Sequence, residues 1–179
     1  MTLLLAGRCP VCGLDLDGMA PPDAVVAVRS LPRRWRGAFA RAGDDEDTEA
    51  LLRRRPAGGG PSALESACRV AEVLALLEGH VRRTTVSEQP DLSPADVDPG
   101  RVASCAERGP EAVLDQLAAA AEALGAALDR VPPGAWLRPA TLDGRLTDVR
   151  GLARAAAHEG THHLREAERT LQEVRGRPD

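Results

Sequence analysis

Apolar residues recur at spacings of three and four along four long segments of this chain, and this pattern limits its fold more than any other feature. In the third segment the repeating residues are Leu114, Leu117, Ala121, Leu124, Leu128 and Val131. This spacing places a continuous apolar stripe along one side of an α-helix. Aromatic residues make up only 2% of the sequence and Ile and Tyr are absent, which disfavours a sheet-rich fold. The 179 residues are therefore predicted to form one all-α domain, a four-helix bundle.

Turn and capping residues place the ends of these helices. The four helices are predicted over about residues 23–42, 62–84, 110–130 and 148–174. Ser62 and Glu65 form a capping box, in which each side chain satisfies a free backbone N–H at the helix start. Pro32 is expected to break the first helix, because proline lacks the N–H that a helix interior uses. Residues 85–109 show no sustained apolar spacing, so we predict a long loop there, with a short helical turn near Ser93.

The sequence divides into a leader over residues 1–22 and the helical bundle over residues 23–175. Its charge and composition limit where the protein is located and what it binds. The formal net charge is -4, so nucleic acid is not an expected partner. No apolar stretch approaches the roughly 20 residues that cross a bilayer, and no basic segment precedes the apolar start, so we expect a cytoplasmic protein with no membrane partner. Four cysteines do not suggest a disulfide scaffold, and Cys68 and Cys105 are expected to be small apolar core residues.

Three of the four histidines lie within six residues of the last predicted helix, and histidine is the commonest metal ligand near neutral pH. His158 and His162 are one turn apart, so both rings can reach one cation. Glu159 and His163 form a second pair with this spacing. The helical wheel places His163 on the apolar stripe and His158 toward solvent. We predict a metal site with His158, His162 and His163 as ligands. The segment also fits the H-E-x-x-H pattern of zinc proteases, but a third ligand downstream is missing.

Cys9 and Cys12 form a C-x-x-C knuckle followed by Gly13, and this spacing lets two thiolates face one metal ion. A complete structural site needs two more ligands, and the sequence has no second C-x-x-C motif. The motif could be a redox pair, although no βαβ pattern surrounds it, or a plain turn with reduced thiols. Alternatively, the two thiolates meet His158 and His162 and complete a closed Cys2His2 site, which would be structural rather than catalytic.

Together these segments resemble the DinB-like (DinB/YfiT) proteins of actinobacteria. The resemblance extends over about residues 8–172 and is carried by the knuckle at 9–13, the capped helix start at 62–68, the predicted hairpin turn at 143–144 after Trp136, and residues 158–164. It implies a four-helix bundle that is often a homodimer. It also implies a divalent cation, commonly zinc or nickel, held by one histidine of the second helix and two of the last.

The resemblance extends to the chemistry of the family. Characterised relatives are thiol-dependent S-transferases and isomerases, and in actinobacteria the thiol is mycothiol. The resemblance therefore implies a small-molecule substrate and a low-molecular-weight thiol as co-substrate, with the metal holding the thiolate as nucleophile.

The chain departs from the family pattern at Arg69, which stands where similar proteins carry the second-helix histidine. Arginine has no lone pair to offer a cation and stays charged, so it cannot be a ligand. His80 lies about 16 Å further along the same predicted helix. Arg69 and His80 are therefore candidate ligand-binding residues, with Arg69 suited to an anionic ligand.

The sequence supports two functional hypotheses. In the first, the protein is a metal-dependent and thiol-dependent S-transferase, with Glu159 or Glu166 as the catalytic proton acceptor. In the second, it is a binding or structural protein of the same fold that has lost the catalytic cation because of Arg69. In that case Cys9 and Cys12 contribute to a structural zinc site.

Overall fold

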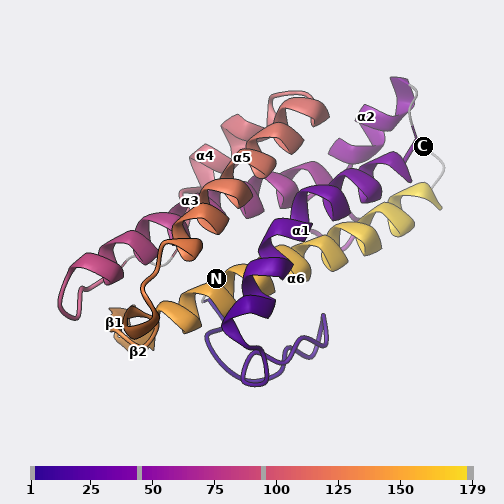
Figure 1. Ribbon diagram of the computed structural model, residues 1–179. Coiled ribbons are helices and arrows are strands. Elements are labelled where there is room, and N and C mark those ends of the chain that lie inside the picture. The colour runs from indigo at the N-terminus through magenta and orange to yellow at the C-terminus, as the bar shows by residue number, and fades with distance from the viewer. Residues whose placement is uncertain (1–2, 44–45, 94–95, 177–179) are drawn as a thin grey trace.

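Six α-helices and one β-hairpin make up the computed structural model, which describes residues 3–43, 46–93 and 96–176 (Figure 1). The helices are α1 (Pro21–Ala40), α2 (Glu46–Arg53), α3 (Ala63–Val86), α4 (Pro99–Ala106), α5 (Pro110–Asp129) and α6 (Val149–Arg175). A 3₁₀ turn (Pro133–Ala135) leads into the antiparallel strands β1 (Pro139–Leu142) and β2 (Arg145–Asp148). The predicted all-α fold class is confirmed.

The four long helices α1, α3, α5 and α6 form the bundle. α3 packs against α5 and α6, and α1 packs against the same two helices, so α1 and α3 lie at opposite corners. Leucine, valine and alanine fill the space between them, and the fully buried side chains include Leu64, Leu74, Leu117, Leu124 and Leu152. Their burial stabilises the bundle by about 25 cal/mol per Å² of apolar surface removed from water. Within the described part of the chain, no helix is both long and apolar enough to span a membrane.

The helix and hairpin ends follow their local chemistry. At the start of α3, Ser62 Oγ accepts from the Glu65 N–H at 3.1 Å, and the Glu65 carboxylate accepts from the Ser62 N–H at 2.8 Å, which confirms the predicted capping box. Asp148 caps α6 by accepting from the Gly151 N–H at 2.8 Å. Asp143 and Gly144 have φ angles of 48° and 73°, the left-handed pair that a two-residue hairpin turn requires. The predicted hairpin is therefore confirmed.

The prediction that Pro32 breaks the first helix is wrong, because α1 continues through it. Proline in a helix interior removes one backbone hydrogen bond and costs about 3 kcal/mol. Val28, Leu31 and Trp35 surround it and are fully buried. Each such side chain contributes roughly 1.5–3 kcal/mol, so packing in the bundle outweighs the local preference.

The expected loop over residues 85–109 contains α4, which lies further along the chain than the turn predicted near Ser93. Asp98 caps this helix by accepting from the Gly100 N–H at 2.8 Å. Cys105 of α4 forms a disulfide with Cys68 of α3, with the two Cα atoms 5.8 Å apart. The expectation that these cysteines are simple core residues is therefore wrong. The reason is that α4, absent from the sequence prediction, brings Cys105 next to α3.

The N-terminal leader covers one side of α6. Leu3 and Leu5 belong to the hydrophobic core, and Leu16 is fully buried. Arg154 of α6 donates to the carbonyl oxygens of Met19 at 2.8 Å and of Asp17 at 3.3 Å. In Figure 1 the leader, coloured indigo, loops beside the first turns of α1 and α6. This side of α6 is consequently buried, although it faces away from the bundle interior.

His80 is a buried histidine of α3. Its Nε2 has no hydrogen-bond partner among residues 3–43, 46–93 and 96–176, and the residue is 5% exposed. Burial lowers the pKa of His80, and the positive charge of Arg83 lowers it further. The folded protein therefore holds His80 neutral, whereas the unfolded chain protonates it near its ordinary pKa of about 6.5.

Acid should therefore destabilise the wild-type protein more steeply than a His80→Gln variant. Below about pH 6.5, unfolding takes up a proton at His80, and this lowers the free energy of unfolding by up to about 1.4 kcal/mol per pH unit. Urea unfolding between about pH 7.5 and 5 should show the free energy of unfolding of the wild type falling more steeply than that of His80→Gln as the pH falls. A constant difference between them across this range would contradict a neutral, buried His80.

Candidate metal centre

Four metal-ligating side chains from the leader and α6 converge at one point. Cys9 and Cys12 of the leader meet His158 and His162 of α6, and one ligand atom from each lies within 4.8 Å of all the others. Cys9 Sγ is 3.4 Å from His162 Nδ1, and the centroids of the two imidazole rings are 5.1 Å apart. In a tetrahedral zinc site with sulfur and nitrogen ligands, the ligand atoms lie about 3.3–3.8 Å apart. The four side chains are therefore close to a coordinating arrangement.

The local backbone explains why both thiols point the same way. The Cys9 N–H donates to the Leu14 carbonyl and the Cys9 carbonyl accepts from the Gly13 N–H, each at 2.9 Å. These bonds close a tight loop around Cys12. Gly13 has a φ of 76°, a left-handed conformation that glycine adopts without steric cost. On α6, the spacing of four residues places the two histidines one turn apart on the side that the leader covers.

His158 has one ring nitrogen engaged and one unsatisfied. Its Nδ1 lies 3.1 Å from Glu159 Oε1, in a hydrogen bond. Its Nε2 is buried and has no hydrogen-bond partner in the part of the chain that the structure describes. An unsatisfied buried polar atom costs about 1–3 kcal/mol. A nitrogen lone pair in this position, beside two thiols, fits a cation ligand.

In His158 and His162, the ring nitrogen on the side away from the thiols contacts a carboxylate. This nitrogen is called the outer nitrogen below. Glu159 accepts from His158, and Glu166 Oε1 lies 3.1 Å from His162 Nε2. The same two carboxylates meet at His163, whose Nδ1 is 2.8 Å from Glu166 Oε2 and whose Nε2 is 3.4 Å from Glu159 Oε2, without a hydrogen bond at the second position. Carboxylates in this position fix the tautomer and orientation of metal-ligating imidazoles.

The electrostatics favour a thiolate in this cluster. Burial raises the pKa of the Cys9 thiol, but the Cys12 backbone N–H and the His158 ring lower it more, to about 6. The thiolate, which is the metal-binding form, is thus the main form at neutral pH. Burial also raises the pKa of Glu159, but the rings of His158 and His163 bring it down to about 2. For His163, burial lowers the pKa and the neighbouring carboxylates raise it above its ordinary value.

The structure divides the three neighbouring histidines between two groups. His158 was expected toward solvent, and this expectation is wrong, because the leader buries it to 5% exposure. His163 faces the other way and does not join the two cysteines. It forms a second group of ligating side chains with His162 and Glu166. His162 therefore belongs to both groups.

Arg69 and His163 lie together along a cavity of about 560 Å³. Arg69 Nη2 pairs with Asp96 at 2.8 Å. Within the described ranges, no group of ligating side chains includes a histidine of α3. His80 does not line this cavity, so the structure does not bring it together with Arg69. Neither Asp96 nor the wall that α4 contributes could be anticipated from local sequence patterns, because α4 itself was not predicted.

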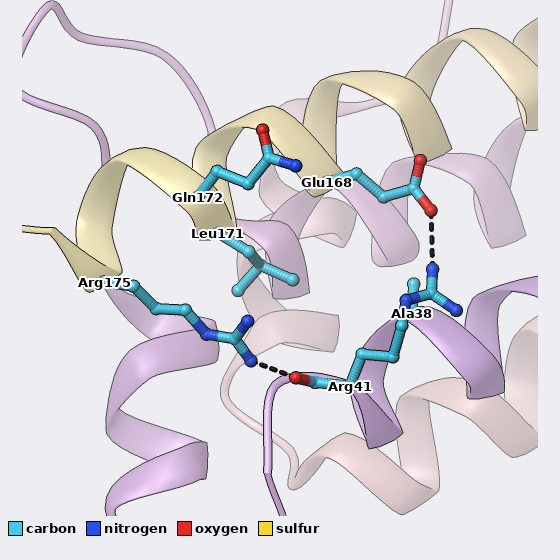
Figure 2. Close-up of a pocket in the computed structure, with 6 residues that line it drawn as sticks. All are labelled: Ala38, Arg41, Glu168, Leu171, Gln172 and Arg175. Atoms are coloured by element: carbon cyan, nitrogen blue, oxygen red, sulfur yellow. Dashed lines mark hydrogen bonds and ion pairs between the residues drawn. The ribbon is translucent and has the colours of Figure 1, made fainter.

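A second cavity of about 300 Å³ lies between the ends of α1 and α6 (Figure 2). Arg41 pairs there with Glu168 at 2.7 Å, and Arg175 donates to the Arg41 carbonyl. These contacts occupy both cations, as the dashed lines in Figure 2 indicate. None of the metal-ligating groups found among the described residues lines this cavity.

Comparisons with known proteins identify the bundle. The sequence profile of the DinB superfamily matches residues 27–167, a span that includes the histidines of α6 but not Cys9 and Cys12. A comparison with curated proteins finds no match. Among solved structures, the chain is similar to YfiT from Bacillus subtilis, described as a probable metal-dependent hydrolase with an unusual four-helix bundle topology. The TM-score is 0.67 over 85% of this chain and 87% of YfiT, at 14% identity, so the likeness supports the fold alone.

Proposed function

Because the chain belongs to the DinB superfamily, we propose that it is a metalloprotein of that fold in which Cys9, Cys12, His158 and His162 hold one structural zinc ion. The observation that carries this proposal is the convergence of two thiols and two imidazoles from segments 153 residues apart in sequence. Soft thiolates together with imidazoles favour zinc over hard cations such as magnesium or calcium.

A structural role follows from the number of protein ligands. When bound, the zinc supplies coordinate bonds to four side chains, which leaves no open position for a substrate. The hydrogen bonds of Arg154 already join the leader to α6. The four ligands would fasten the leader to α6 at a second place, near the middle of that helix.

Glu159 and Glu166 act in this proposal as positioning residues rather than as proton acceptors. Each presents an oxygen to the outer nitrogen of one histidine, at 3.1 Å in both cases. This contact directs the opposite nitrogen of each ring toward the thiols.

Glu166→Gln is therefore expected to weaken zinc binding by about 10-fold to 100-fold without abolishing it. Competition with a chromophoric chelator measures the affinity. Glu168→Gln is the matched control, because Glu168 lies on the same helix and pairs with Arg41 instead. Equal zinc affinity in wild type and Glu166→Gln would rule out the positioning role.

A thiol-dependent S-transferase, with mycothiol as the thiol, is the second candidate function. The observation in its favour is the group formed by His162, His163 and Glu166, since two of these residues line the cavity at Arg69. Glu166 or Glu159 would then accept the thiol proton. Thiol transfer by the wild-type protein would support this candidate. If the wild type does not transfer a thiol but the Arg69→His variant does, the result would instead support a protein that has lost its catalytic cation because of Arg69.

Metal analysis of the purified protein tests the first candidate directly. We expect one zinc per chain in the wild type, and an absorption spectrum of a tetrahedral thiolate complex after exchange with cobalt. His162→Ala should lower the metal content, whereas His80→Gln should not. Protein that is folded but takes up no stoichiometric zinc or cobalt on titration would refute the proposal.

A further inference from the structure

Arg69 lines the cavity of about 560 Å³ and carries one unsatisfied hydrogen-bond donor. Its Nη2 is used by Asp96, but its Nε is buried and has no hydrogen-bond partner among the described residues. An N–H of a guanidinium cannot lose its proton, so only an acceptor can satisfy it. This need points to a ligand that carries an oxygen acceptor, and most strongly to an anionic one.

The other charged groups of the cavity are already paired. Arg55 binds Glu65 through two nitrogens, with the Nε at 3.0 Å from Glu65 Oε2. Glu166 uses one oxygen for His162 and the other for His163. Among the described side chains that line the cavity, two buried nitrogens then lack a hydrogen-bond partner, Arg69 Nε and His163 Nε2. Of these two, the guanidinium N–H of Arg69 can act only as a donor, whereas an imidazole nitrogen can donate or accept. The polar end of a ligand would therefore be placed at α3.

The remaining wall is apolar and comes from two separate segments. Pro61 precedes α3, and Pro99, Val102 and Ala103 belong to α4. Sites for small molecules usually have volumes of about 300–1,000 Å³ and combine apolar walls with a few well-placed polar groups. This cavity meets both criteria.

We propose that the cavity binds a small organic carboxylate. The carboxylate group accepts from the Nε–H of Arg69, and a short hydrocarbon body lies against Pro61, Pro99 and Val102. This site is distinct from the Cys2His2 cluster, contains neither cysteine, and does not depend on the proposed zinc.

Calorimetric titration with butanoate, butanamide and inorganic phosphate tests the proposal. Butanoate should bind the wild type, butanamide should bind at least tenfold more weakly because it lacks the charge, and phosphate should bind more weakly because it cannot use the apolar wall. Arg69→Gln should weaken butanoate binding at least tenfold. Arg82→Gln is the matched control, an exposed arginine of the same helix that pairs with Glu78, and it should bind as the wild type does.

A second variant keeps the test decisive if Arg69→Gln does not fold. Val102→Phe fills the apolar end of the cavity and leaves Arg69 in place, and it should also abolish butanoate binding. The proposal is overturned if folded wild type does not bind butanoate, if Arg69→Gln binds it unchanged, if Val102→Phe binds it unchanged, or if phosphate and butanamide bind as well as butanoate.

Discussion

Cys9→Ser is expected to release the proposed zinc and to lower the melting temperature by about 8–16 °C. An ion present at about 1,000 times its dissociation constant stabilises the folded state by about 4 kcal/mol. In a domain of this size, each 1 kcal/mol shifts the melting temperature by about 2–4 °C. A serine hydroxyl is not ionised at neutral pH and does not replace the thiolate as a ligand. Thermal unfolding followed by circular dichroism, with metal analysis of the same sample, measures both effects.

A chelator separates loss of the ion from loss of packing around the buried Cys9 side chain. In the wild type, a strong chelator should lower the melting temperature nearly as much as the substitution does. In Cys9→Ser it should have no further effect. A wild-type melting temperature that does not respond to the chelator would contradict the structural role. A Cys9→Ser protein that keeps its zinc would exclude Cys9 as a ligand.

Reduction of the Cys68–Cys105 disulfide is expected to lower the free energy of unfolding by about 4 kcal/mol. The bond joins residues 37 positions apart, and the chain-entropy relation gives about 4 kcal/mol for a loop of that length. It also holds α4 against α3, where Arg101 pairs with Glu72 at 2.7 Å. Urea unfolding with and without a phosphine reductant measures the change.

Cys105→Ser provides the control for the disulfide. This variant should unfold like the reduced wild type, and the reductant should not affect it. If the reductant destabilises Cys105→Ser by as much as the wild type, the effect comes from other thiols, such as Cys9 and Cys12. If it destabilises neither protein, the disulfide does not contribute to stability.

The bundle could be predicted from the sequence because its signals are local. The spacing of apolar residues, the capping box at Ser62 and the turn at Asp143 each depend on residues within a few positions of one another, and each is found in the structure. The exceptions, Pro32 and the disulfide, depend on contacts between distant segments. At these positions, tertiary contacts outweighed the local preferences on which the predictions were based.

The candidate metal centre was predictable only as one of several alternatives. The spacing of Cys9 and Cys12, and that of His158 and His162, indicated two pairs of ligands. Nothing in the sequence indicated that the pairs would meet. The helical wheel separates only the face of α6 that points into the bundle from the face that points to solvent. It cannot show that the leader covers part of the second face. For this reason it assigned His158 to solvent, although the leader buries it.

The two pairs of ligands in the proposed zinc site are far apart in the sequence, with Cys9 and His162 separated by 153 positions. During synthesis the cysteines emerge first and stay without imidazole partners until α6 has left the ribosome. A chain that terminates before α6 retains both thiols but cannot complete the tetrahedron. Tight retention of the proposed ion would therefore distinguish chains that contain α6 from chains truncated before it.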